Sequence, residues 1–164
     1  MPPPGRKPHG AGAAGGVIIH KEAVMEVYVK ESDRWLRQAE YDLKVAEWNQ
    51  QGGFHSPACF WAQQAAAKAL RSFLFFYSED AGESRSVTDL LDRALTYEEE
   101  FKTAVGKSTN LDLYYKTARF PDALPGGIPA EILTGRDSTE AIRTASDILA
   151  MVEKKRKGFL PETM

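Results

Sequence analysis

The sequence has little of what disulfide-bonded, membrane-spanning and secreted proteins require. Its single cysteine, Cys59, can form neither an intramolecular disulfide nor a C-x-x-C metal pair. The longest uninterrupted apolar runs, such as Phe73 to Tyr77, are far shorter than the roughly 20 residues that cross a bilayer. Residues 1–16 contain no hydrophobic region of the kind found in a signal peptide. These absences favour a cytoplasmic protein.

An excess of charge of one sign is also missing. The chain has 21 basic and 23 acidic side chains, so it lacks the positive field of a strong duplex-DNA binder. Its three histidines, His9, His20 and His55, show no metal-binding spacing, and no metal site is predicted. We interpret acidic runs such as residues 98–100 as solvated helix starts rather than acid–base pairs. Any anion site must therefore be local.

Composition divides the chain into four parts. Residues 1–16 are a Gly/Pro/Ala-rich tract that cannot bury enough surface to offset its ordering entropy, which predicts a disordered leader. Residues 17–30 mix β-branched residues with helix formers and fit either a strand or a lead-in helix. Residues 31–158 are expected to form the folded domain, and residues 159–164 a C-terminal tail.

Hydrophobic periodicity within residues 31–158 is helical. Leu36, Ala39, Leu43 and Ala46 repeat at three- and four-residue intervals after Ser32, a good N-cap. Similar patterns predict helices over residues 57–77, from residue 86 through residue 94, over residues 96–117 with a kink or a break at Gly106, and over residues 137–158. Residues 120–136 are too rich in proline and glycine for continuous helix. The expected fold is an all-α antiparallel up-and-down bundle of four to five helices with the second at its centre.

Two cations mark the second helix. Lys68 and Arg71 are three residues apart and therefore share a helix face, which makes them a candidate cationic spot. The alternative interpretation is that both are ordinary solvated residues.

Three stretches carry a family resemblance: Trp35–Leu43, Phe60–Leu70 and Tyr114–Pro125. They resemble the HEPN (higher eukaryotes and prokaryotes nucleotide-binding) domain, and the resemblance covers residues 31–158. The continuation at Leu124–Pro129 is most similar to the HEPN domain at the C-terminus of sacsin, a large chaperone-like protein. The resemblance implies a helical bundle that forms homodimers, and its members include metal-independent ribonucleases and non-catalytic nucleotide binders.

The ribonuclease members share an arginine followed by four to six residues and a histidine, a pair suited to acid–base chemistry on RNA. No arginine in this sequence precedes a histidine at that distance. Thr88 also stands where many members have a histidine. We therefore expect no enzymatic activity.

The resemblance then implies binding. Lys68, Arg71, Lys116 and Arg119 match the family's cationic positions and are predicted to bind a nucleotide such as GTP or ATP, while Tyr114 and Tyr115 could stack on its base. For Arg119 the alternative is a bond to Asp122 or to a loop carbonyl, and for the tyrosines it is core packing. We also predict that the protein forms homodimers and requires no cofactor. Chaperone proteins are possible partners. The alternative functions are a dimerisation scaffold without ligand and a divergent ribonuclease.

Overall fold

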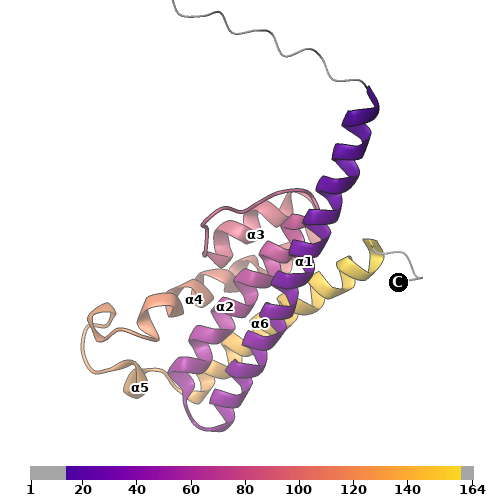
Figure 1. Ribbon diagram of the computed structural model, residues 1–164. Coiled ribbons are helices and arrows are strands. Elements are labelled where there is room, and N and C mark those ends of the chain that lie inside the picture. The colour runs from indigo at the N-terminus through magenta and orange to yellow at the C-terminus, as the bar shows by residue number, and fades with distance from the viewer. Residues whose placement is uncertain (1–13, 160–164) are drawn as a thin grey trace, which may run out of the picture.

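The computed structural model describes residues 14–159, with side chains from Ala23 onward, and this part of the chain contains helices and no strand (Figure 1). The expected all-α bundle is confirmed, with six α-helices where four to five were expected. Its elements are α1 (Ala14–Gln51), α2 (His55–Phe75), α3 (Val87–Leu95), the 3-10 helix η1 (Glu99–Ala104), α4 (Val105–Thr117), the 3-10 turn η2 (Pro121–Ala123), α5 (Pro129–Ile132) and α6 (Gly135–Phe159).

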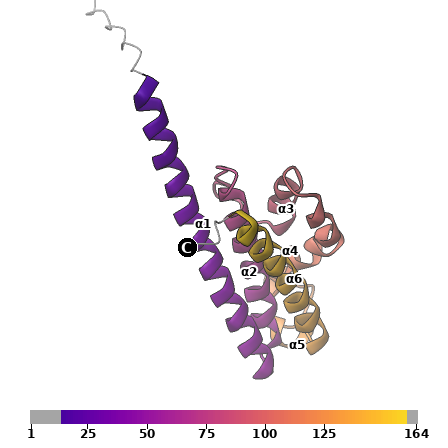
Figure 2. The same ribbon diagram turned by 90° about the vertical axis from the view of Figure 1, so that its right-hand side faces the viewer.

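Helix α2 occupies the centre of the bundle, as its apolar circumference predicts. It contacts α1, α3, α4 and α6, and α1 and α2 run side by side as an antiparallel pair (Figures 1 and 2). Its largest fully buried side chains, Leu70, Phe73 and Leu74, form the middle of the core. Phe73 meets Phe101 edge to face, with ring centroids 4.7 Å apart, which fixes η1 against α2.

Small side chains line the seam between α1 and α2. Ala39 and Ala46 of α1 and Ala62, Ala65, Ala66 and Ala69 of α2 are fully buried, so the two helices can approach closely. Two buried hydroxyls bond across this seam: Ser72 Oγ donates to the Ser32 carbonyl oxygen at 2.6 Å, and the two Oγ atoms lie 3.1 Å apart.

The predicted start of the first helix is wrong. Ser32 does not cap a helix, because α1 begins at Ala14. The Ser32 hydroxyl instead bonds to Ser72 inside the bundle. No glycine or proline interrupts residues 17–51, so nothing in the sequence ends the helix there. Residues 14–16, assigned to the leader, and residues 17–30 therefore lie in α1, whose first part extends beyond the other helices (Figure 2). Residues 1–13 and 160–164 lie outside the described residues.

Other helix boundaries differ from the predicted ones by a few residues. The second helix begins at His55, and its cap residue Phe54 makes no side-chain bond, so Ser56 is not the cap. The Ser86 cap is confirmed, since its Oγ accepts a hydrogen bond from the Asp89 amide at 3.1 Å. Residues 96–117 are divided, as the alternative of a break predicted: the 3-10 helix η1 gives way to α4 at Val105, one residue before Gly106.

Candidate functional site

Three neighbouring cavities lie in a series that starts on α2 and ends on the last turn of α4 and the segment after it, and together we call them the α2 groove. The first measures about 110 Å³, the second about 370 Å³ and the third about 650 Å³. The first two share Arg85 and the last two share Tyr115, so each cavity is a neighbour of the next. The first is lined by Trp35, Gln64, Ala67, Lys68, Arg71, Ser84 and Arg85; the second by Gln63, Glu83, Arg85, Ser86, Asp112 and Tyr115; the third by Tyr115, Lys116, Arg119, Phe120, Asp122 and Ala123.

Helical spacing explains why these residues meet. Gln64, Lys68 and Arg71 are separated by four and three residues, so they lie in one row along α2. Phe60, four residues before Gln64, continues the row toward Arg119. The structure thus places five of the six residues predicted from the sequence, all except Tyr114, along a single groove.

Lys68 is an ion-pair partner within the bundle. Its Nζ lies 2.5 Å from Oδ2 of Asp42, a carboxylate that is only 1% exposed. The Gln38 side-chain amide donates to the other oxygen of Asp42 at 2.8 Å. Lys68 is therefore not simply a solvated residue. Because an ammonium group has three N–H donors, the ion pair with Asp42 leaves further donors that can bind a ligand.

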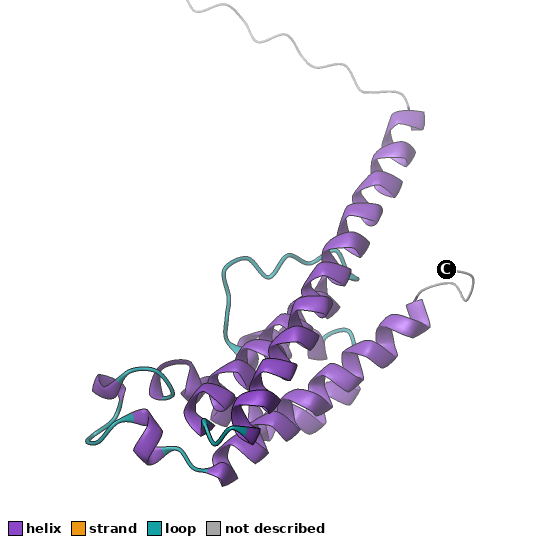
Figure 3. Cartoon of the chain, turned by 60° about the horizontal axis from the view of Figure 1, so that its bottom comes forward, coloured by secondary structure: helices purple, strands orange, loops and turns teal. Residues whose placement is uncertain are grey.

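Arg71 holds the loop between α2 and α3. Its guanidinium donates to the carbonyl oxygens of Gly82 and, at 3.3 Å, Ser84, and it lies over the Trp35 ring at 4.6 Å from the centroid. The loop consequently returns beside α1 (Figure 3). Burial is the main cause that lowers the pKa of Arg71; Asp80 opposes it, and Arg85 adds to the lowering. Cations are thus crowded at this end of the groove.

Arg85 is a groove residue that the sequence analysis missed. Its side chain is exposed and has no ion pair among the described residues, while its carbonyl oxygen accepts a hydrogen bond from the Gln63 side chain at 2.9 Å. The one available signal was its position directly before the Ser86 cap, at the end of a loop that must return to the bundle.

Asp112 fixes the same loop from the other side. Its carboxylate accepts hydrogen bonds from the amides of Val87 at 2.7 Å and Thr88 at 2.9 Å, from Ser86 Oγ at 2.9 Å, and from Gln63 Nε2 at 3.2 Å. Burial raises the pKa of Asp112, but these hydrogen bonds outweigh it and hold the pKa below its ordinary value. The charge is directed at the first turn of α3, where the helix dipole favours it.

The far end of the groove combines a cation with aromatic rings. Arg119 Nε donates to the Tyr115 carbonyl oxygen of α4 at 2.7 Å, so its partner is neither Asp122 nor a carbonyl of the following loop, as the alternative had it. The guanidinium lies 4.3 Å from the Phe60 centroid, 4.5 Å from that of Tyr115 and 4.8 Å from that of Phe120. Lys116 is exposed beside it, without an ion pair among the described residues.

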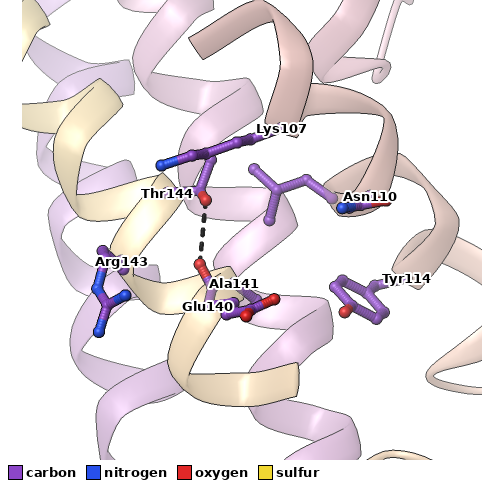
Figure 4. A pocket seen from close by; sticks show the side chains of 8 residues that line it. Lys107, Asn110, Tyr114, Glu140, Ala141, Arg143 and Thr144 are labelled. Carbon is purple, nitrogen blue, oxygen red and sulfur yellow. Dashed lines mark hydrogen bonds between the residues drawn. The ribbon is translucent and has the colours of Figure 1, made fainter. Parts of the chain in front are cut away.

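Tyr114 lies outside the groove. It lines a separate cavity of about 210 Å³ between α4 and α6, facing Glu140 (Figure 4). Burial is the main cause that raises the pKa of its phenol to about 12, and the negative charges of Asp137 and Glu140 add to it. Adjacent residues on a helix point about 100° apart, which is why Tyr114 and Tyr115 do not form one stacking platform.

No histidine is among the residues that line the three cavities of the α2 groove. His55 lies at the start of α2, where its Nδ1 is 2.9 Å from Ser138 Oγ, and it lines none of the three cavities. Among the side chains that the structure describes, residues 23–159, no group of three or more His, Cys, Asp or Glu could hold a metal ion. No helix within residues 14–159 is long and apolar enough to cross a membrane.

Comparison with known proteins identifies related chains. The family model described as the HEPN domain matches residues 32–155. The crystal structure of TT1696 from Thermus thermophilus is 35% identical, with a TM-score of 0.67, and the match covers 76% of this chain and 97% of that one. The structure of ST0689, an archaeal HEPN homologue, is 33% identical, with a TM-score of 0.63 and the same coverage. No curated protein matches the chain.

Proposed function

Because the chain belongs to the HEPN domain family, we propose that it is a non-catalytic module whose α2 groove binds a nucleotide such as GTP or ATP. The observation that carries the proposal is the first cavity, which is lined by Lys68, Arg71 and Arg85 and by no acidic side chain. Guanidinium and ammonium groups are the donors that phosphate oxygens prefer in proteins. A nearly neutral chain thereby concentrates positive charge at one place.

The rest of the groove suits a base and a sugar. From Arg71 to Phe60 the groove follows eleven residues of α2, a distance of about 16 Å, which is comparable to the length of an extended nucleoside triphosphate. Tyr115 and the guanidinium of Arg119 offer flat surfaces beside the widest cavity. Bases stack on aromatic rings and on guanidinium planes. Lys116 and Arg119 supply further cations at that end.

The absence of catalysis is part of the proposal. RNA cleavage of the family type needs an imidazole or an equivalent base within hydrogen-bond reach of the 2′-hydroxyl. The sequence has no correctly spaced arginine and histidine, and Thr88 bonds to Ser108 and Asp112, where it orders the start of α3. Asp112, which lines the second cavity together with Glu83, has its carboxylate oxygens engaged by hydrogen-bond donors.

A homodimer is also part of the proposal. Leu113, Phe120, Ile128 and Ile132 are each 45–57% exposed on α4 and the segment that follows it, next to Arg119. Exposed apolar side chains gathered beside a functional element are typical of interaction sites. A two-fold contact there would bring Lys116 and Arg119 of both chains to one seam and double the local positive charge.

The cellular setting is proposed from the sequence. The similarity of Leu124–Pro129 to the sacsin type supports a chaperone-related parent protein, and the lone, buried Cys59 is consistent with the cytoplasm.

Calorimetric titration with ATP and GTP tests the binding claim. We expect saturable heat for the wild-type chain and at least tenfold weaker binding for Arg85→Ala, because one charge-assisted hydrogen bond contributes about 1.5–3 kcal/mol. Lys102→Ala is the matched control, since Lys102 is an exposed cation on η1, outside the groove. No heat at millimolar ATP and GTP would reject nucleotide binding and leave the scaffold function.

Two further assays address the remaining claims. Sedimentation equilibrium should give a dimer for the wild-type chain and a monomer for Phe120→Glu; a wild-type monomer would reject the dimer. An RNA-cleavage assay in EDTA should show no activity. Cleavage that disappears in Arg119→Ala would reverse our conclusion and favour a divergent ribonuclease.

A further inference from the structure

We infer that the first cavity of the α2 groove recognises a terminal phosphomonoester: the ligand enters end-on, and its last phosphate, not a bridging one, occupies the cavity. The inference rests on the proposed function and assigns a chemical preference to the same site.

Size is the first argument. The cavity measures about 110 Å³, whereas the next two measure about 370 and 650 Å³. Sites for whole small molecules occupy about 300–1,000 Å³, so the first cavity accommodates a phosphate group but not a nucleoside. The groove therefore widens in the order in which a nucleotide does, from phosphate to sugar and base.

Charge is the second argument. Three cations line the cavity, and Asp42 compensates one of them through its 2.5 Å contact with Lys68. Arg71 is directed to loop carbonyls, which are uncharged, and Arg85 has no acidic partner among the described residues. Asp80 exerts an opposing charge on Arg71 without lining the cavity, so an excess of positive charge remains along the lining. A phosphomonoester carries about −1.5 to −2 near neutral pH, while a bridging phosphodiester carries one negative charge.

The walls are the third argument. A bridging phosphate has two ester carbons and needs two exits, one toward each neighbour in the strand. Arg85 opens the cavity toward the wider part of the groove. On the other side stands Trp35, whose ring is covered by the Arg71 guanidinium. Beyond Trp35 lies a cavity whose charged residues, Glu31 and Arg34, already pair with each other at 2.6 Å. A phosphate chain continuing in that direction would find no uncompensated cation.

The test compares ligands that differ only in the terminal phosphate. Titrations of the full chain would use ATP, ATP whose γ-phosphate is capped as a methyl ester, and one short RNA oligonucleotide with either a 5′-phosphate or a 5′-hydroxyl. We expect capping to weaken ATP binding at least tenfold and the 5′-phosphate to strengthen RNA binding at least tenfold if a strand end is the source. Discrimination on ATP alone identifies a free nucleotide as the source and supports the inference equally.

Arg85→Ala should remove this discrimination, and Lys102→Ala should preserve it. Equal affinities for capped and uncapped ATP, together with equal affinities for the two oligonucleotides, would overturn the inference while nucleotide binding itself stands. Absence of binding by all four ligands would overturn both.

Discussion

Replacing Asp112 tests how the α2 groove is held in shape. Its carboxylate accepts four hydrogen bonds, two of them from the first amides of α3. Hydrogen bonds to a charged group contribute about 1.5–3 kcal/mol each, and because Asp112 is only half-buried we use the low end. The two amide bonds then predict that Asp112→Ala lowers the free energy of unfolding by about 3 kcal/mol, and Asp112→Asn by about half of that.

The assay is thermal and urea unfolding followed by circular dichroism. For a domain of this size, about 3 kcal/mol corresponds to a decrease in Tm of roughly 6–12 °C. Asp92→Ala is the matched control, because Asp92 is an exposed carboxylate on α3, and its loss should change stability by less than about 0.5 kcal/mol. An Asp112→Ala variant as stable as the control would refute the capping role.

Acidification gives an independent check on the same carboxylate. The folded-state pKa of Asp112 is lowered, so its contribution is complete above the ordinary carboxyl value near 4 and is lost as the pH falls through the lowered value. The stability difference between the wild type and Asp112→Asn should therefore shrink below about pH 4. A difference that grows on acidification would contradict the assignment.

Three other predictions concern buried groups. Lys68→Met should lower the free energy of unfolding by about 3–5 kcal/mol, because it leaves the Asp42 carboxylate buried without its partner, and Asp42→Asn in the same chain should recover part of the loss in urea titrations. Burial, followed by the charge of Asp137, raises the pKa of the Cys59 thiol to about 12, so the thiol should not react with Ellman's reagent at pH 8 until urea unfolds the chain; rapid native reaction would contradict this. Tyr114→Phe should remove one tyrosine that ionises near pH 12 from the ultraviolet titration, whereas an unchanged high-pH phase would show that another phenol is responsible.

The bundle was predictable because its signals are local and repeated. The spacing of Leu36, Ala39 and Ala46 identifies the buried face of α1, and the apolar circumference of α2 predicts its central position. The Ser86 cap was likewise found from a four-residue pattern. Such signals depend only on helix geometry, which every part of the fold shares.

The interactions that the sequence did not predict have partners that lie far away in sequence. Ser32 satisfies the N-cap rule, but its hydroxyl bonds to Ser72, forty residues later, and no local pattern reveals that pairing. Lys68 was identified as a site cation, yet only the folded chain places Asp42 against it. Arg85 was missed because it lies in a loop, and only the hydrogen bonds of Gln63 and Asp112 to residues 85–88 place that loop against α2.

The paired hydroxyls of Ser32 and Ser72 have a consequence for how α1 and α2 are aligned. Alanine seams are smooth, and sliding one such helix past the other by a turn, about 5.4 Å, would bury nearly the same area. The slide would separate both hydroxyls from their partners inside an apolar interior, at about 1–3 kcal/mol for each unsatisfied group. The serines therefore help to fix the alignment of α1 and α2, together with the Lys68–Asp42 ion pair across the same interface, and a chain with alanine at both positions would hold that alignment less strongly.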